Sequence, residues 1–292
     1  MSQVLTDKPT RPLLRYHGGK WRMAPNLIAM FPEHRVYVEP FGGGASVLLQ
    51  KPRSPAEIYN DLDREIVNVF REMRDNGAAL IDKLQFTPFS REEFNLSREP
   101  AADALEQARR TIVRSFMGYG TTLTRVNVGN GEVQRTGFRR LRRDSTTTAA
   151  DWQGLPEAFL AIFERLQGVV IEHMDACAVM QEHDAVDTLF YVDPPYVHSA
   201  RQAKQGKSKM GYRHELDDAG HRRLAEVLHG LKGMVILSGY RSPLYDELFG
   251  DWACSERTAW TINAGERTEV VWRNEAARCA EIDQFLMFGG IA

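Results

Sequence analysis

The sequence is poor in cysteine and lacks long apolar runs. Its three cysteines, Cys177, Cys254 and Cys279, have neither the spacing of metal ligands nor that of a disulfide framework, which suits a reducing compartment. No apolar run approaches the length that a bilayer-spanning helix needs. The polar N-terminus, MSQVLTDKPTRP, lacks the apolar core of a signal peptide. We therefore expect a cytoplasmic protein that does not enter a membrane.

A strong overall charge and clusters of metal ligands are also missing. The formal net charge is −2, so the chain as a whole carries no signal for nucleic acid. The eight histidines show no ligand spacing, and we expect no metal site. Hydrophobic residues make up 43% and charged residues 26% of the chain, which are ordinary values for a soluble globular protein. The 292 residues are enough for one or two domains with a sizeable core.

What the sequence does contain is an alternation of short apolar runs with segments of helical spacing. The runs are VYVE (36–39), EIYN (57–60), VVIE (169–172), TLFYV (188–192), MVILS (234–238), RTAWTI (257–262) and EVVWR (269–273). The last two flank a short connection and predict an antiparallel hairpin. Between some of the runs, residues such as Ile66, Val67, Phe70 and Met73 form an apolar stripe at helical spacing. This order predicts an α/β fold with a mostly parallel sheet, whose ligands bind at the carboxyl ends of the strands.

One connection, between the second and third runs, is far longer than a crossover helix needs. Residues from about 80 to 159 are therefore predicted to be an inserted domain. The stretch 109–143 holds nine arginines against one acid, Glu132. Inside it, TRVNVGNGEVQRT (124–136) has two alternating arms around a Gly-Asn-Gly turn, which predicts a two-stranded ribbon. Because such a ribbon fits the major groove, we favour contact with DNA over a solvated helix face.

Acidic side chains stand where the first three runs end. The first run ends at Glu39 and leads through a glycine-rich turn into a helix start, without a phosphate-binding Lys-Ser/Thr. An acid after the second strand, here Asp61, commonly holds ribose hydroxyls in such folds, although a helix cap explains Asp61 equally well. For Asp175, after the third run, a helix cap is the default explanation. Together these acids predict a nucleoside-like ligand with an amino group, such as S-adenosylmethionine.

The fourth run ends abruptly in Asp193-Pro194-Pro195-Tyr196. The amino group of a base is a weak nucleophile because its lone pair is delocalised into the ring. Asp193 and the carbonyl of Pro194 could accept both N–H groups and so direct that lone pair. Tyr196 offers a ring on which a base rotated out of the duplex could stack. A simple turn is the ordinary alternative, but the acids and the basic ribbon favour methylation of a base amino group.

These motifs resemble those of the Dam-like DNA adenine methyltransferases, which modify the exocyclic N(6) amino group. The resemblance covers nearly the whole chain and rests on RYHGGK (15–20), EPFGGGAS (39–46), GYGTTLTRVN (118–127), DPPY (193–196), LSGY (237–240) and RTEVVW (267–272), in the family's order. It implies a Rossmann-like methyltransferase fold with a seven-stranded, mostly parallel sheet whose last strand is antiparallel. It also implies an S-adenosylmethionine-binding catalytic domain (1–79 and 160–292) and an inserted helical and β-hairpin domain (80–159) that recognises double-stranded DNA.

The resemblance also implies roles for individual residues. The expected catalytic residues are Asp193, Pro194, Pro195 and Tyr196. The expected cofactor-binding residues are Tyr16, Lys20, Glu39, Pro40, Phe41, Gly42, Gly43, Gly44, Asp61, Asp175 and Ala176. The expected DNA-binding residues are Arg125, which would read a guanine, together with Asn127, Gln134, Arg135, Arg139 and Arg140. The family often has a phenylalanine that stacks on the cofactor where this chain has Ala176, so the stacking must come from another residue, such as Phe41.

Two other functions are compatible with these motifs. Cytosine N(4) methylation uses the same acceptor geometry but usually has serine in place of Asp193. A catalytically inactive DNA-binding relative is the second alternative. Cytosine C-methylation is disfavoured because none of the three cysteines follows a proline.

The basic segment 198–215, which has few apolar residues, is expected to order over the DNA backbone around the extruded base. The target sequence, a restriction partner and the oligomeric state stay open, with a monomer slightly favoured.

Overall fold

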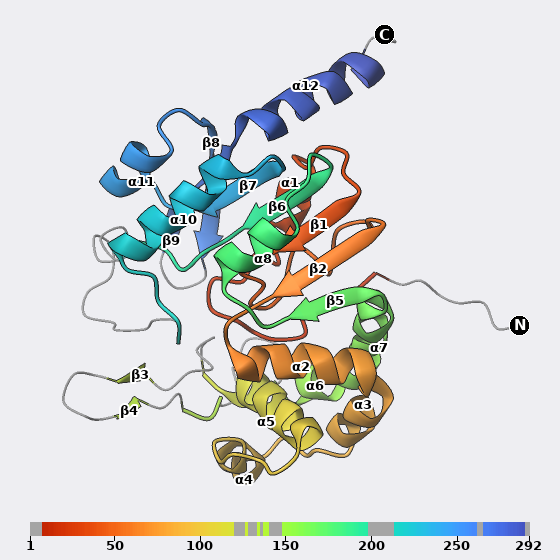
Figure 1. Cartoon of the computed structure of the whole chain (residues 1–292). Helices are drawn as coiled ribbons and strands as arrows, with labels where there is room; N and C mark the ends of the chain where they lie inside the picture. Colours follow the sequence, from red (N-terminus) through yellow and green to blue (C-terminus); the bar gives the residue numbers. More distant parts are fainter. Residues whose placement is uncertain are drawn as a thin grey trace, which may run out of the picture.

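A seven-stranded sheet with the order β5-β2-β1-β6-β7-β9-β8 forms the centre of the molecule (Figure 1). The computed structural model describes residues 8–119, 126–127, 133–134, 137–139, 148–197, 213–261 and 265–289. The strands of the sheet are β1 (Val36–Glu39), β2 (Ala56–Asn60), β5 (Val169–Glu172), β6 (Thr188–Val192), β7 (Met234–Gly239), β8 (Ala253–Thr261) and β9 (Gly265–Arg273). The first five pair in parallel, whereas β9 runs antiparallel to β7 and β8. Each predicted run coincides with a strand, and the predicted fold class is confirmed.

Side chains of the central strands alternate between two hydrophobic cores, because successive residues of a strand point to opposite faces of the sheet. In β6, Leu189 and Tyr191 belong to one core, and Phe190 and Val192 to the other. All five residues of this strand are buried. A strand covered on both faces reads as a continuous apolar run, which is why TLFYV does not alternate with polar residues.

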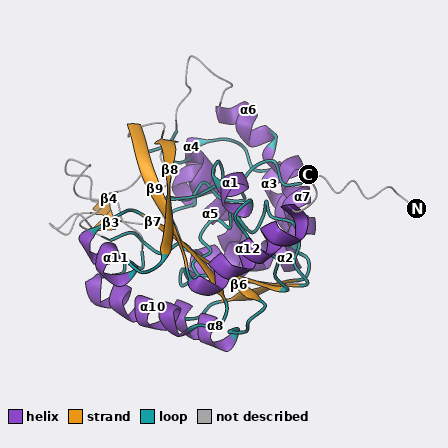
Figure 2. Ribbon diagram, turned by 90° about the horizontal axis from the view of Figure 1, so that it is seen from above, coloured by secondary structure: helices purple, strands orange, loops and turns teal. Residues whose placement is uncertain are grey.

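Helices cover both faces of the sheet (Figure 2). On one face, α8 (Ala176–Glu182), α10 (Asp218–Gly230) and α11 (Pro243–Leu248) contribute to the core that contains Phe190. The other core receives side chains from α1 (Ala24–Ile28), α2 (Arg64–Asp75) and α12 (Glu275–Gly289). The predicted apolar stripe of α2 is buried in this second core. The result is a three-layer arrangement that leaves the ends of the strands accessible.

The remaining helices lie beyond the β5 edge of the sheet (Figure 1). They are α3 (Gly77–Gln85), α4 (Arg91–Leu96), α5 (Ala104–Met117), α6 (Thr148–Gln153) and α7 (Leu155–Leu166). Ile112 of α5 and Phe159 of α7 belong to the same core as Phe70 of α2. The helices between the second and third sheet strands therefore continue the hydrophobic core on that face of the sheet. Whether residues 80–159 act as a separate domain stays a prediction.

The predicted ribbon is present as β3 (Val126–Asn127) and β4 (Val133–Gln134), which pair antiparallel. At its base, Gly118 bridges Phe138, and the amide of Arg139 donates to the carbonyl of Met117 at 2.7 Å. The ribbon thus starts and ends at the C-terminal end of α5. The expected contact residues Arg125, Arg135 and Arg140 lie outside the described residues.

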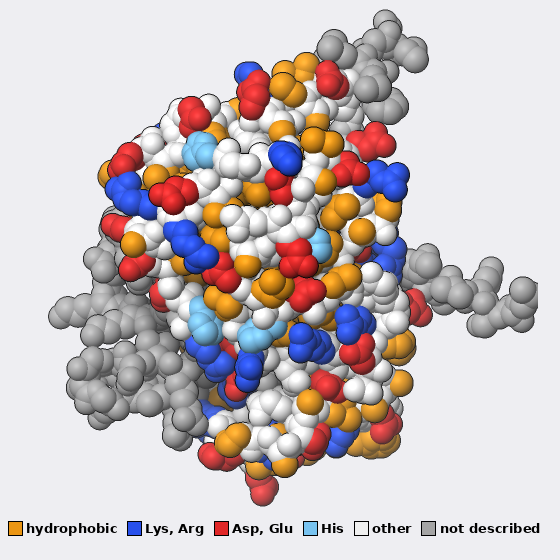
Figure 3. Space-filling model, viewed as in Figure 1, with side chains coloured by type: hydrophobic (Ala, Val, Ile, Leu, Met, Phe, Trp, Pro, Cys, Tyr) orange, Lys and Arg blue, Asp and Glu red, His pale blue; other side chains and the backbone are white. Residues whose placement is uncertain are grey.

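The arginine excess of this region overstates its basic surface. Three of the nine arginines lie on α5 and form ion pairs with acids outside the stretch that was counted. Arg109 and Arg110 pair with Glu106, and Arg114 pairs with Glu65, at 2.6–3.0 Å. Their side chains are only 9–15% exposed. On the face drawn in Figure 3, basic and acidic side chains are interspersed over these helices. These three arginines therefore add little to a basic DNA-binding surface, because their charges are balanced within the protein.

Candidate active site

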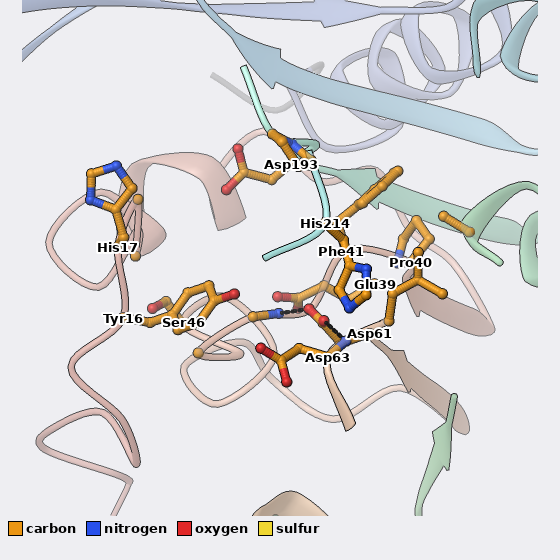
Figure 4. A pocket seen from close by; sticks show the side chains of 18 of the residues that line it. Tyr16, His17, Glu39, Pro40, Phe41, Ser46, Asp61, Asp63, Asp193 and His214 are labelled. Atoms are coloured by element: carbon orange, nitrogen blue, oxygen red, sulfur yellow. Dashed lines mark hydrogen bonds between the residues drawn. The ribbon is translucent and has the colours of Figure 1, made fainter. Parts of the chain in front are cut away.

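A pocket opens at the carboxyl ends of β1, β2 and β6 (Figure 4). Open α/β sheets bind their ligands at this edge. Most of the residues predicted from the sequence line the pocket: Tyr16, Lys20, Glu39, Pro40, Phe41, Gly42, Gly43, Gly44, Asp61, Ala176, Asp193 and Pro195. The lining also contains residues that the sequence did not single out, among them His17, Ser46, Asp63 and Leu216. Arg213 and His214, at the end of the predicted basic segment 198–215, line it too, whereas residues 198–212 lie outside the described residues.

The glycine-rich loop after β1 is shaped by two tyrosines. A Cβ on Gly42 would lie 2.1 Å from the ring of Tyr59, and one on Gly43 would lie 2.9 Å from the ring of Tyr16. Gly43 also has a φ of +47°, in the left-handed region that favours glycine. The sequence predicted that these glycines allow a ligand to approach the backbone closely. In the structure, glycine is needed at Gly42 and Gly43 because the loop passes close to the two tyrosine rings.

Asn60, which the sequence did not single out, ties three strand ends together. Its side-chain amide donates to the carbonyls of Pro40, at 2.9 Å, and Met174, at 3.1 Å. Its side-chain oxygen accepts from the amide of Met174 at 2.8 Å. The residue is fully buried. Because one side chain satisfies backbone groups that follow β1 and β5, the loops around the pocket are held at fixed positions.

Asp61 holds the glycine-rich loop and does not cap α2. Its carboxylate accepts from the amides of Gly43, at 2.8 Å, and Asp63, at 2.7 Å (Figure 4). The cap of α2 is Asp63, which accepts from the amide of Glu65 at 3.0 Å. Burial raises the pKa of Asp61, and the two backbone hydrogen bonds oppose this rise. Asp61 is thus a half-buried carboxylate at the wall of the pocket.

Glu39 is a buried acid whose hydrogen-bond donors are neutral groups. Its Oε2 accepts from the hydroxyl of Tyr37 at 2.9 Å and from the amide of Leu48 at 3.0 Å. Burial raises its pKa to about 8, although both hydrogen bonds act in the opposite direction. Near neutral pH the carboxyl is therefore mostly protonated, and a cationic ligand would favour its ionised form.

Asp193 is fixed by one hydrogen bond to each carboxylate oxygen. Lys20, 173 residues away in sequence, donates from Nζ to Oδ2 at 2.8 Å. Ser238 of β7 donates from Oγ to Oδ1 at 2.8 Å, and the hydroxyl of Tyr191 lies 3.2 Å from the same Oγ. Ser238 belongs to the LSGY motif, to which the sequence gave no role. Its position explains why a small hydroxyl residue follows the apolar run of β7.

Tyr196 and Pro194 lie beside the pocket and are not part of its lining. The ring of Tyr196 packs edge-on against Tyr240 with centroids 4.4 Å apart, and Lys20 Nζ lies 5.0 Å from its centroid. Only 7% of Tyr196 is exposed. In the described structure, its ring is therefore mostly covered by these neighbours.

Asp175 adopts the arrangement that the default explanation expected. It caps α8 by accepting from the amides of Cys177, at 3.1 Å, and Ala178, at 3.2 Å, and it pairs with Arg223 at 2.9 Å. Its side chain does not line the pocket, whereas the next residue, Ala176, does. The role of Asp175 in cofactor binding stays a prediction.

The described residues contain neither a cluster of metal ligands nor a membrane-spanning helix. No three His, Cys, Asp or Glu side chains in this part of the chain are grouped as a metal site would require. Among the described helices, none is long and apolar enough to cross a membrane.

Comparison with known proteins identifies the family. The model of the D12 class N6 adenine-specific DNA methyltransferases matches residues 16–261. The chain belongs to this family. It is also 27% identical over 283 residues to the Type II methyltransferase M1.LlaDCHI of Lactococcus lactis subsp. cremoris, and the match covers 90% of this chain and 95% of the relative. The protein is therefore an adenine-specific DNA methyltransferase that needs a methyl donor and acts on DNA. The resemblance found in the sequence is confirmed, and the cytosine N(4) and inactive alternatives are not supported.

Proposed function

We propose that this methyltransferase takes its methyl group from S-adenosylmethionine bound in the pocket and transfers it to N(6) of an adenine rotated out of double-stranded DNA. One arrangement carries the proposal: Asp193 lines the same pocket as Glu39 and Asp61. A carboxylate that can accept from an amino group thus lies beside two acids suited to a cationic nucleoside.

The lining has the chemistry that this cofactor needs. Glu39 would accept from the ammonium group, and Asp61 would accept from the ribose hydroxyls, as acids at this strand position commonly do. Phe41, Ala176 and Leu216 supply apolar surface for the adenine ring. The glycine-rich loop offers no Lys-Ser/Thr for a phosphate, which agrees with a nucleoside that carries none.

The catalytic residues act on the target amino group. S-adenosylmethionine, when bound, supplies an electrophilic methyl carbon on a sulfonium. Asp193 would accept one N–H of the adenine amino group and the carbonyl of Pro194 the other, so that the nitrogen lone pair is directed away from the ring. Lys20 and Ser238 fix the orientation of Asp193 beforehand, and preorganised partners of this kind are a main source of catalysis. The amino proton that would be hydrogen-bonded to Asp193 would leave only after the new N–C bond has replaced the methyl–sulfur bond, so no general base has to act first.

We further propose that the ribbon reads the DNA sequence. Arg125, Asn127 and Gln134 would contact base edges, while Arg135, Arg139 and Arg140 would contact base edges or phosphates. The antiparallel pairing of β3 with β4 supports this assignment, because a two-stranded ribbon fits the major groove. The similarity to the Lactococcus Type II methyltransferase supports a role in restriction–modification.

The decisive experiment removes the acceptor. The Asp193→Ala variant should lose about 100- to 1000-fold in methyl transfer from tritiated S-adenosylmethionine, because one preorganised partner is gone. The Asp187→Ala variant is the matched control, since Asp187 is an exposed acid that pairs with Arg35 outside the pocket. Wild-type turnover by Asp193→Ala would refute the catalytic assignment. Sequencing of the modified DNA would give the target site.

A further inference from the structure

Four consecutive residues that belong to no recognised motif form a wall of the pocket. Arg213, His214, Glu215 and Leu216 all line it, and they precede α10. Figure 4 shows His214 pointing into the pocket on the same side as Phe41 and Asp61. We refer to residues 213–216 as the wall segment.

The wall segment is attached to the start of α2 by two ion pairs. Arg213 donates from Nη1 to Asp63 Oδ1 at 2.8 Å and from Nη2 to Glu65 Oε2 at 3.2 Å. Asp63 is separated from Arg213 by 150 positions in sequence, and its side chain is only 4% exposed. The two acids stand two and four positions after Asp61, so the turn that presents Asp61 to the pocket also anchors the wall segment.

Glu65 is itself held from a third element. Arg114 of α5 donates to the same Oε2 at 2.6 Å and to the carbonyl of Ser97 at 2.9 Å. The Arg114 side chain is 11% exposed. A buried arginine bound to backbone thus fixes the rotamer of Glu65, and Glu65 in turn presents a fixed oxygen to Arg213.

The wall segment adds both charge and apolar surface to the pocket. Burial raises the pKa of Asp61, and the charge of His214 is among the influences that lower it, which indicates that the two side chains are close. Leu216 packs against the same core as Phe41. Together with Ala176, these two residues form an apolar part of the lining, where the family often has a phenylalanine.

We propose that Arg213 is a positioning residue of the cofactor site, whose ion pairs with Asp63 and Glu65 hold His214 and Leu216 against the bound nucleoside. The proposal rests on the proposed function, in which S-adenosylmethionine occupies this pocket. The Arg213 side chain is 38% exposed, and an ion pair with such a partly exposed cation contributes little to stability. The effect of Arg213 is therefore expected in the affinity for cofactor and not in the stability of the free protein.

Calorimetric titration of the full chain with S-adenosylmethionine, without DNA, tests the proposal. Arg213→Gln should raise Kd about tenfold, which corresponds to about 1.4 kcal/mol. Glu65→Gln should raise Kd severalfold, because Arg213 keeps its contact with Asp63. Arg114→Gln should raise Kd by less, because Arg114 acts on Arg213 only through Glu65. Arg213→Lys should restore part of the affinity, since one ammonium cannot match the two-armed contact. Asp63 is left unchanged because it caps α2.

Glu72→Gln is the matched control. Glu72 lies on the same helix, accepts from the side chain of Asn76 at 2.8 Å and does not line the pocket. Its Kd should stay within about twofold of wild type, and without ligand the unfolding midpoints of Glu72→Gln and Arg213→Gln should stay close to wild type. If Arg213→Gln bound as tightly as wild type, the ion pairs would be ordinary surface contacts and the proposal would be wrong. If wild type itself did not bind S-adenosylmethionine, the proposed function would fail instead.

Discussion

Two buried glutamates on neighbouring strands of the sheet have opposite surroundings. Glu57, near the start of β2, receives Lys51 at 2.7 Å and Arg165 at 2.6 Å. Glu39, at the end of β1, receives the hydroxyl of Tyr37 and the amide of Leu48. Both residues are 3% exposed. The first acid is compensated by two cations, whereas the second is surrounded by neutral donors.

The pKa values of the two acids differ accordingly. Burial acts to raise the pKa of Glu57, but the hydrogen bonds and charges of Arg165 and Lys51 outweigh it and leave the pKa below its ordinary value. Burial raises the pKa of Glu39 to about 8, because its neutral donors oppose the shift only in part. Charge is thus balanced inside the protein at the edge away from the pocket. At the pocket, a cationic ligand would supply the balancing charge under the proposed function.

The largest expected effect on stability is at Glu57, whose charge is balanced by two cations. Arg165→Met should lower the free energy of unfolding by about 3–5 kcal/mol, because it leaves part of a buried ion network uncompensated. Denaturant titration at neutral pH measures this loss. Arg222→Met is the control, since Arg222 forms an exposed pair with Glu247, and such pairs contribute about 0–1 kcal/mol. Equal losses in the two variants would show that the network around Glu57 is not the stabilising element inferred from its burial.

At Glu39, a substitution should weaken cofactor binding without lowering stability. Glu39→Gln replaces a mostly protonated acid by a neutral group of similar shape that cannot ionise in the unfolded state, so it should not lower the free energy of unfolding at pH 7. The Kd for S-adenosylmethionine should rise by a factor that corresponds to about 1.5–3 kcal/mol, the typical contribution of a hydrogen bond to a charged group. Calorimetry and denaturant titration give the two quantities. A loss of stability without loss of affinity would place Glu39 among the purely structural acids.

The pH dependence of stability offers a smaller but sharper test of the same residue. The pKa of Glu39 is raised from 4.5 to about 8 in the folded protein. Between these values the folded state holds a proton that the unfolded state has released, so this contribution is complete below pH 4.5 and is lost as pH rises through about 8. The wild type should therefore lose stability relative to Glu39→Gln across this range, by at most about 1.4 kcal/mol per pH unit. Parallel stability curves for the two proteins would mean that the acid is ionised when folded.

Local patterns in the sequence predicted most of the sheet and part of the pocket. Strands such as TLFYV were recognisable because burial on both faces demands continuous apolar residues. The sequence predicted that Glu39, Asp61 and Asp193 lie close together, because parallel strands end at one edge of the sheet.

Contacts between distant positions could not be predicted in this way. The pairing of Lys20 with Asp193 and of Arg213 with Asp63 depends on how whole elements pack, which no local spacing records. The same limit explains the error over the arginines of α5. Their partner acids, such as Glu65, lie outside the stretch in which charge was counted.

The smallest expected effects concern two serine hydroxyls, one beside the pocket and one in the ion network around Glu57. Ser238 donates to Asp193 beside the pocket, whereas Ser54 accepts from Lys51 in the network around Glu57. Ser238→Ala should lower kcat about three- to tenfold, because Asp193 loses one of the two contacts that orient it and a hydrogen bond contributes about 1 kcal/mol. Its Kd for S-adenosylmethionine should stay close to wild type. Ser54→Ala should leave kcat unchanged and lower only stability, by a similar free energy. Single-turnover methylation at saturating DNA separates the two variants, and equal kcat values would show that Lys20 alone suffices to orient Asp193.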